Sequence, residues 1–501
     1  MTFRTLAANQ RASMLLLLFL PAALRIFLLP QHPVPTPAVS DEFSYVLLAD
    51  TLRHLRLANP VHPMHDFFET FFVLQEPSYS SIFPLGQGIV LIAGWFGVAL
   101  SIGLFCALCY WMLCVWLRPT WALAGGVLAA LQFGPLSQWM NSFWGGAVSA
   151  CAGCLIFGSL PRLREQGSAL YVICFGLGLG LQLLTRPFEL IFLLISAAAL
   201  CAVERIDPRR LLPALAPFSA AVVLMAFHNH AVTKSWTTMP YQVSRYEYGV
   251  PASFTFESNP TPHRTLTREQ QLDYEAQCAV HGAGTDSLGE FVNRWLFRWR
   301  YYRFFLTPPL YIALFGFALT WRNKTSRWIA FCVLVFSLGT NFYPYFYSHY
   351  IAAVTSLIIL ACLLGLQRLG PEAARVVLFL CGAHFVFWYG LHALENTRFK
   401  TDLTRYETWD AINHDDPEGR IAIHRQLSEA PGKQLVFVRY GAMHRFREWV
   451  HNAADPDSSQ IVWARDLGRA ENEKLRRYYP DRTVWLLRPD ASPPALSRYD
   501  R

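Results

Sequence analysis

The chain has 501 residues, of which 53% are hydrophobic, 15% are aromatic and only 16% are charged. Soluble proteins carry about 25% charged residues. This composition excludes a disordered chain, a collagen and a disulfide-rich mini-protein, and it indicates a membrane protein with some soluble mass. The formal net charge of +8 does not predict a nucleic-acid partner, because the basic residues gather in short loops between apolar runs, as membrane topology requires.

Eleven apolar runs predict membrane-spanning helices, which need about 20 mostly apolar residues. The runs cover residues 12–29, 85–117, 120–136, 144–160, 168–184, 187–203, 211–228, 304–321, 327–341, 350–368 and 374–392. The first run lacks a small-residue cleavage site and is followed by prolines, so we interpret it as an anchored span rather than a secretory signal. The second is long for one crossing and has candidate breaks at Gly97 and Gly103. We predict a single span there, because a split would invert every later loop.

The basic residues of the short loops predict the orientation, because cytoplasmic loops are enriched in lysine and arginine. If residues 1–11 are cytoplasmic, every later loop on that side carries a basic residue. These loops are Arg118, 161–165, 204–210, 321–327 and 367–375. We therefore expect a multi-pass protein of a bacterial inner membrane with a cytoplasmic N-terminus. Its membrane domain would cover 1–392, with extracytoplasmic loops at 31–84 and 229–303, and its extracytoplasmic tail would cover 393–501.

The tail alternates short apolar segments with polar helical ones. Strands are predicted at 434–440, 460–466 and 483–489, and a helix at 471–480. This pattern is typical of a small α/β domain with a partly parallel sheet. The predicted fold class is therefore an all-α polytopic membrane protein of about eleven transmembrane helices with a small C-terminal α/β domain. The tail has no Gly-rich phosphate loop and no cysteine, so we expect no cofactor.

Ten of the eleven cysteines lie in apolar runs, and Cys278 is the exception. The pairs 106/109 and 151/154 have the C-x2-C spacing of zinc sites, but each lies inside a hydrophobic helix without a second pair or a histidine in polar surroundings. We predict buried core cysteines and no zinc site.

Asp41 and Glu42 follow the first span within about a dozen residues and begin the segment SDEFSYVLLADTL. Acids are favoured in the first turn of a helix and Ser40 can cap that helix, which is a purely structural interpretation. The other interpretation is that one carboxylate is a general base for an acceptor hydroxyl at membrane level. The apolar face of the segment predicts a helix that lies along the bilayer.

A second polar cluster follows in the same loop, formed by His62, His65, Asp66 and Glu69 between phenylalanines. Histidine and carboxylate side chains can ligate a metal ion. We favour an interfacial helix with aromatic anchors.

Four further polar residues lie at predicted outer ends of spans: Arg25, Asn141, Arg186 and His349. Each could be a snorkelling or interfacial residue. Together they place cations and hydrogen-bond donors on the same side of the membrane as the acidic pair at 41–42. Such an arrangement can hold a lipid phosphate while a carboxylate acts on the transferred group.

The strings SDEFSYVLLADTL, FFETFFVLQEPSYSSIFPLGQG, MNSFWGGAV and TRPFE resemble a bacterial subgroup of the GT-C glycosyltransferases. That superfamily includes protein O-mannosyltransferases, the aminoarabinose transferases of lipid A and the RgtA/B/C/D-like bacterial enzymes. The fold resemblance covers roughly residues 10–392, and seven predicted spans before a large second loop match the family core. The string matches are confined to the first half of the chain.

The resemblance implies a polyprenyl-phosphate sugar as donor and inversion at the anomeric carbon. Asp41 matches the catalytic acidic position of the family, and Glu42 is its companion. By position, Arg186 and His349 are candidates for the donor phosphate. Further substrate-binding candidates are Arg25, Asn141, Tyr79 and His62. The acceptor would be a lipid, a cell-envelope glycan or a protein, and a divalent metal is compatible with this scheme but not required.

Two other classes compete with this interpretation. A transporter or lipid flippase would also be polytopic, with charged residues along a substrate path. We find no twofold hydropathy repeat with matched broken helices, which many secondary transporters have. An O-antigen-ligase-type polymerase would use outer arginine and histidine without an acidic pair after the first span.

Overall fold

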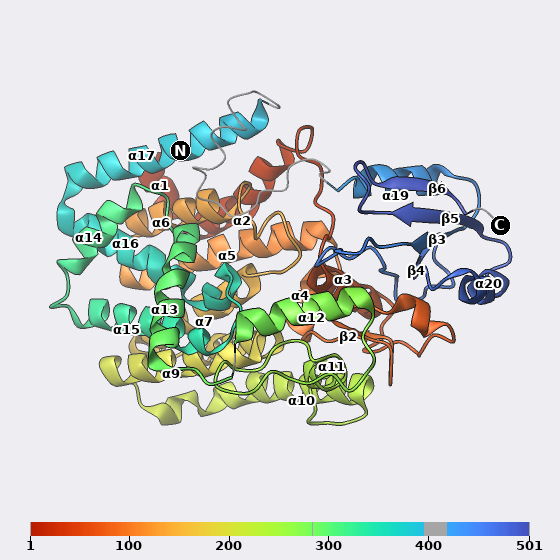
Figure 1. Ribbon diagram of the computed structural model, residues 1–501. Coiled ribbons are helices and arrows are strands. Elements are labelled where there is room, and N and C mark those ends of the chain that lie inside the picture. Colours follow the sequence, from red (N-terminus) through yellow and green to blue (C-terminus); the bar gives the residue numbers. More distant parts are fainter. Residues whose placement is uncertain (1, 283, 395–417, 500–501) are drawn as a thin grey trace.

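The structure is a computed structural model that describes residues 2–282, 284–394 and 418–499. A large helical body occupies one side and a small sheet domain the other (Figure 1). The helices before the tail are α1 (Phe3–Ala8), α2 (Gln10–Ile26), α3 (Ser40–Arg53), α4 (Leu85–Leu91), α5 (Trp95–Trp116), α6 (Pro119–Phe133), α7 (Ala147–Gln166), α8 (Ala169–Thr185), α9 (Pro187–Glu204), α10 (Leu215–Thr233), α11 (Pro240–Tyr248), α12 (Arg268–His281), α13 (Leu288–Arg298), α14 (Leu310–Ala318), α15 (Lys324–Gly339), α16 (Thr355–Leu369) and α17 (Pro371–Ala393).

Each predicted span coincides with one or more of these helices. Five described segments are long and apolar enough to cross a membrane: Trp95–Trp116, Pro187–Glu204, Pro208–Thr233, Ser348–Leu369 and Pro371–Ala393. The helices Pro119–Phe133 and Ala169–Thr185 are apolar but shorter. These helices are typical of a multi-pass membrane protein. The count of eleven spans stays a prediction.

The long run at 85–117 contains a break that neither candidate glycine makes. Helix α4 ends at Leu91 and α5 begins at Trp95. Gly94 between them has a φ of 61°, a left-handed conformation that glycine adopts without a steric penalty. Gly97 and Gly103 instead serve close packing, because a Cβ there would lie 1.8 Å and 1.9 Å from backbone carbonyl oxygens. With seven residues, α4 is too short to cross a bilayer, so the break is compatible with the single predicted span.

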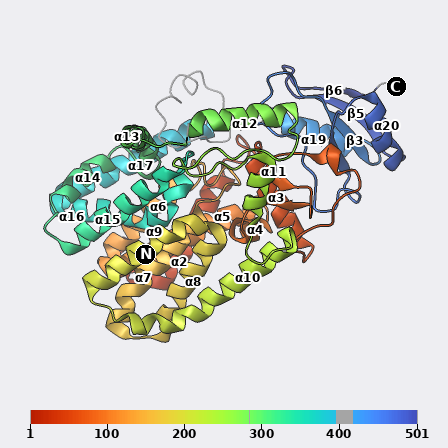
Figure 2. The same cartoon turned by 60° about the horizontal axis from the view of Figure 1, so that its bottom comes forward.

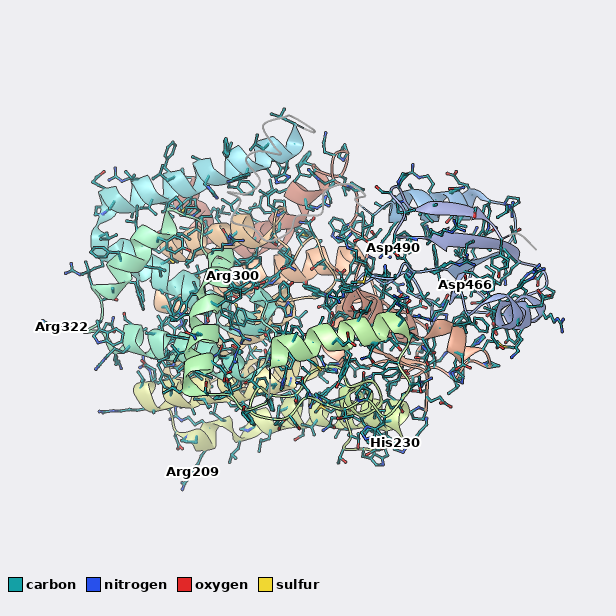
Figure 3. The ribbon with its side chains drawn as sticks, in the orientation of Figure 1. Arg209, His230, Arg300, Arg322, Asp466 and Asp490 are labelled. Atoms are coloured by element: carbon teal, nitrogen blue, oxygen red, sulfur yellow. The ribbon has the colours of Figure 1, made fainter. Side chains whose placement is uncertain are left out.

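Two of the basic turns predicted to be cytoplasmic lie away from the sheet domain. Figure 3 labels Arg209 and Arg322, and both project from the part of the helical body remote from the tail. Asp466 and Asp490 mark the tail at the other side. The arrangement is compatible with the predicted orientation, which remains a prediction.

The tail is a four-stranded mixed sheet of order β4-β3-β5-β6. Its strands are β3 (Gln434–Val438), β4 (Ile461–Arg465), β5 (Thr483–Arg488) and β6 (Ala495–Arg498), and its helices are α19 (Arg420–Glu429) and α20 (Arg469–Tyr478). Strand β3 pairs in parallel with β4 and β5, and β6 pairs antiparallel with β5. The predicted strands, helix and partly parallel sheet are confirmed. The predicted domain boundary at 392/393 adjoins residues 395–417, which lie outside the described residues.

The two faces of this sheet are covered by different partners, because side chains alternate along a strand. Val436 and Val438 pack with residues of α19. Leu435 and Phe437 pack with α20 and with Phe67 of the first loop. The tail is therefore built onto the loop that carries the acidic pair.

The segment 62–72 is not the interfacial helix that the sequence predicted. It contains a four-residue 3-10 turn, His65–Phe68, followed by a short antiparallel pair, β1 (Val73–Leu74) and β2 (Ser80–Ser81). Phe67 and Phe68 are buried against the tail sheet, so they are anchors for a protein domain rather than for lipid.

The ten cysteines of the apolar runs are free thiols and are buried or partly buried, as predicted. Cys278, the exception, is also free and partly buried. Cys106, Cys109, Cys151 and Cys154 belong to the main hydrophobic cluster.

Candidate functional site

The acidic pair begins α3, but it does so without the predicted serine cap. The N-cap residue is Val39, which has no side-chain capping bond, and Ser40 is already helical. Asp41 and Glu42 occupy the first turn, where the helix dipole favours negative charge. The two carboxylates then have different surroundings, which separates their roles.

Glu42 is buried and ties two chain segments together. One carboxylate oxygen accepts the backbone N–H of Ala38 at 2.9 Å. The other accepts the backbone N–H of Phe143, also at 2.9 Å, in the loop between α6 and α7. Burial raises the pKa of Glu42, and these bonds oppose that rise. Because both oxygens are occupied, Glu42 is a positioning residue for the start of α3.

Asp41 is partly exposed, and no ion pair to its carboxylate is formed by the residues that the structure describes. Burial, and then the neighbouring charge of Glu42, raise its pKa to about 7, while Arg186 lowers it. A carboxyl group with a pKa near neutrality can exchange a proton at physiological pH. Both acids have a raised pKa, and Asp41 is the one whose side chain is partly exposed, so it is the candidate general base.

Arg186 lies at the corner between α8 and α9, beside this carboxylate. Its Nη1 donates to Glu189 at 2.8 Å, and its guanidinium lies 4.4 Å from the ring centre of Tyr350. Glu189 is 3% exposed and fixes the arginine from one side. A guanidinium has five N–H groups, so donors besides the one bound to Glu189 are available for an anion.

His349 completes the group from the segment before α16. Its ring stacks on Tyr350 at 4.8 Å, lies 5.7 Å from the ring of Trp144, and is within electrostatic reach of Arg186. The buried indole N–H of Trp144 finds no acceptor among the described residues. The structure therefore brings Asp41, Arg186 and His349 together, as the sequence predicted, and adds an unpaired donor beside them.

Arg25 and Asn141 have a different place. The guanidinium of Arg25 is 1% exposed, donates to the Asn141 side chain at 2.8 Å, and also donates to the carbonyls of His32 and Pro33. The Asn141 amide donates in turn to two carbonyls of its own loop. These contacts stabilise the loop that reaches Glu42, and a phosphate would have to displace them.

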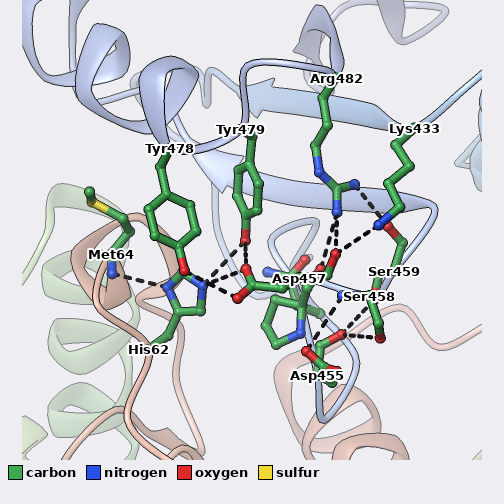
Figure 4. A network of polar contacts seen from close by, with 12 residues as sticks. His62, Met64, Lys433, Asp455, Asp457, Ser458, Ser459, Tyr478, Tyr479 and Arg482 are labelled. Atoms are coloured by element: carbon green, nitrogen blue, oxygen red, sulfur yellow. Dashed lines mark hydrogen bonds and ion pairs between the residues drawn. The ribbon is translucent and has the colours of Figure 1, made fainter.

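His62 and Tyr79 lie at the contact between the first loop and the tail. His62 accepts the N–H of Met64 on Nδ1, so its Nε2 carries the proton and donates to Asp457 at 3.0 Å. Tyr479 donates to the same aspartate at 2.5 Å (Figure 4). The hydroxyl of Tyr79 donates to the carbonyl of Asn452 at 3.1 Å. Both residues thus serve domain docking.

The possible metal ligands of the first loop are close together, but one of them, Glu69, is already bonded to other residues. One ligand atom each of His65, Asp66 and Glu69 lie within 4.8 Å of one another. Glu69 is already paired with Arg264 and accepts the hydroxyl of Tyr248 at 3.0 Å. A carboxylate neutralised by arginine is a poor cation ligand, so these residues do not fit a metal well.

Three neighbours of Asp41 were not predicted as site residues. Tyr45 lies one turn further along α3, and Tyr343 and Tyr345 lie in the segment between α15 and α16; all three interact electrostatically with Asp41. Glu189 is the fourth missed residue. Its spacing of three from Arg186 is the usual helical ion-pair spacing and is a signal in the sequence. The three tyrosines had no such signal in the sequence, because an aromatic residue at a span end is typical of any membrane interface.

No family model matches the chain, and no curated protein matches it. Among solved structures, it is similar to the oligosaccharyltransferase AglB of Archaeoglobus fulgidus in complex with an inhibitory peptide and a dolichol-phosphate. The TM-score is 0.44 and the identity 12%, over 96% of this chain and 69% of that one. The Archaeoglobus fulgidus oligosaccharyltransferase in complex with Zn and sulfate gives 0.45 and 13%, over 95% and 67%. Its apo form gives 0.38 and 12%, over 86% and 62%.

All three similar structures are of an oligosaccharyltransferase, and their sequence identity to this chain is 12–13%. The likeness is too distant to carry a donor, an acceptor or a mechanism over to this chain, and the functional conclusion rests on the geometry around Asp41.

Proposed function

We propose that the protein is an integral-membrane glycosyltransferase that moves a sugar from a polyprenyl-phosphate donor to an extracytoplasmic acceptor. One observation carries the proposal. A partly exposed carboxyl group with a pKa of about 7, Asp41, lies within the field of a fixed guanidinium, Arg186. A base and an anion site side by side are the two parts that such a transfer needs.

The reaction is an in-line displacement at the anomeric carbon. Asp41 takes the proton of the acceptor hydroxyl or amine as the acceptor atom bonds to that carbon. The bond from the carbon to the phosphate oxygen breaks, and its electron pair leaves with the lipid phosphate. Arg186 stabilises the negative charge that grows on the phosphate, and His349 and the indole N–H of Trp144 donate beside it. One base and one displacement invert the anomeric centre.

The location of the reaction follows from the same residues. Asp41, Arg186 and His349 all lie at span ends assigned to the extracytoplasmic side. The donor lipid would therefore reach the site from the outer leaflet of a bacterial inner membrane. The acceptor would be a cell-envelope lipid, a glycan or a protein. The scheme uses no cofactor and needs no divalent metal, because Arg186 supplies the positive charge.

The test is release of lipid phosphate by purified protein in nanodiscs, given a panel of polyprenyl-phosphate sugars and a cell-envelope extract as acceptor. We expect release that depends on the extract and is lost in Asp41→Asn. Glu76→Gln, an exposed acid of the same loop, is the matched control and should behave as the wild type. A folded wild-type protein that releases lipid phosphate from none of the donors would refute the proposal and favour the transporter class.

A further inference from the structure

The tail domain is hydrogen-bonded to the backbone just before the acidic pair. The N–H of Glu448 donates to the carbonyl of Ala38 at 3.1 Å, and Val39 forms an antiparallel bridge with Arg447. Nη2 of Arg420 donates to the same carbonyl of Ala38 at 3.2 Å. The carbonyl of Ala38 is thus bonded to the tail, while its N–H is bonded to Glu42.

The tail also holds the residue just after the acidic pair. The ring of His451 stacks on Phe43 with centres 3.9 Å apart and an angle of 18° between the planes. The Arg420 guanidinium lies 5.4 Å from the ring centre of Phe43 and 4.2 Å from that of Trp449. Burial and the charge of Arg420 lower the pKa of His451 to about 3. The stack is therefore neutral and unchanged across physiological pH.

The tail can hold α3 in place because it is also bonded to the far end of α3 and to the two large loops. The side chain of Asp50, at the other end of α3, accepts the N–H of Ala454 at 2.7 Å. Thr70 donates to Glu448 at 2.5 Å. On the second loop, Glu269 of α12 is paired with Arg465, and α12 extends to the tail in Figure 2. These contacts leave little freedom between the tail and α3.

We propose that the tail is a positioning domain for the transfer reaction, with Arg420 and His451 as the residues that hold segment 38–43 and hence Asp41 in place. This inference rests on the proposed function. Neither residue needs to touch the substrate. They act through Ala38 and Phe43, which flank the base on both sides.

The surroundings of Asp41 set its pKa, which can be followed in the pH–rate profile. General destabilisation of the fold would not change this pKa. It faces Glu42 and Tyr45 on its own helix, Arg186 at the corner of α8 and α9, and Tyr343, Tyr345 and Tyr350 from the segment between α15 and α16. If α3 moves outward, the carboxyl group becomes more exposed to water and its pKa falls towards the ordinary value of 3.8. The acidic limb of the pH–rate profile, at about pH 7 in the wild type, then moves to lower pH.

The experiment compares His451→Ala and Arg420→Met with the wild type in nanodiscs. The measurements are kcat, KM, the pH dependence of kcat/KM, which reports the pKa of the free enzyme, and hydrogen exchange of the amides in residues 36–45. We expect kcat to fall by up to about 10²-fold, as a displaced catalytic group allows, with KM for the donor little changed. The acidic limb should move down by about one to two pH units. Exchange in residues 36–45 should become faster.

Two further variants separate positioning from a general loss of docking. His451→Phe keeps an aromatic ring for the stack and should restore kcat and the pH profile. Asp457→Asn weakens the docking contact to His62 without touching segment 38–43, and should leave the pH profile unchanged. Unaltered kcat and pH profile in both His451→Ala and Arg420→Met would overturn the proposal. If the wild type shows no turnover, the proposed function fails, and unaltered exchange in residues 36–45 would then overturn the positioning role separately.

Discussion

Replacing Asp41 by asparagine should destroy activity and at the same time stabilise the fold. Asparagine has nearly the same shape and cannot ionise. As the base, Asp41 contributes about 10²–10⁴-fold to the rate, so transfer should fall by that factor. Ordinary damage to a folded protein lowers activity and stability together, so the opposite signs make this variant informative.

The size of the stabilisation follows from the pKa of Asp41, about 7 against an ordinary 3.8. Between these values the folded chain holds a proton that the unfolded chain has lost, so the free energy of unfolding decreases as pH rises from about 4 to 7. Each pH unit is worth about 1.4 kcal/mol, which gives at most about 4 kcal/mol. The partial exposure of the side chain reduces this to about 2–4 kcal/mol at pH 8. Below pH 4 the variant and the wild type should be equally stable.

The assay is the unfolding midpoint of wild type, Asp41→Asn and the control Glu76→Gln, followed by tryptophan fluorescence at pH 8 and at pH 5 and paired with lipid-phosphate release. The variant should have the higher midpoint at pH 8, and a smaller advantage at pH 5. Normal turnover in Asp41→Asn would refute the assignment of the base. A lower midpoint at pH 8 would refute the reasoning from burial.

Three more outcomes follow from the same contacts. Glu42→Gln should lower transfer, because one of its two backbone N–H partners would face an amide donor instead of an oxygen and the start of α3 would lose that contact; wild-type transfer rates in Glu42→Gln would contradict this. Arg186→Met should raise KM for the donor and destabilise the fold by leaving Glu189 buried and unpaired, whereas the double variant with Glu189→Gln should recover stability but not donor use, as unfolding and kinetics would show together. Treatment with a chelator should leave lipid-phosphate release unchanged, and restoration of a lost activity by added Mg²⁺ or Mn²⁺ would show that a metal takes part.

The predictable part of the site depended on topology. Asp41, Arg186 and His349 lie far apart in the sequence, but the basic loops assigned all three to the same side of the membrane. Residues at one end of a helical bundle are close in space, so their meeting follows from the assignment. Their exact partners do not, because Glu189 and Tyr350 are ordinary residues of a span end.

The sequence did not predict which partner covers each apolar residue, whether lipid or another part of the protein. The phenylalanines at 67 and 68 are apolar and had to be covered, but hydrophobic pattern does not distinguish lipid from a protein sheet. The alternation of Leu435 and Phe437 likewise predicts a buried face without naming its partner. Arg25 was interpreted as a snorkelling, interfacial or substrate-binding residue, whereas its guanidinium is bonded to Asn141 and to two backbone carbonyls. Backbone acceptors are invisible in a sequence.

The two hydrogen bonds that the tail donates to the carbonyl of Ala38 have a consequence for how the protein matures. Its tail partner, Glu448, is more than four hundred residues further along the chain. During synthesis, every span leaves the ribosome before the residues that hold the start of α3. The start of α3 can be held in its final place only after the tail has been made and folded, so an incomplete chain would have its membrane helices without this support. The proposed transfer activity would then appear only in chains that have been synthesised in full, and incomplete chains would be inactive.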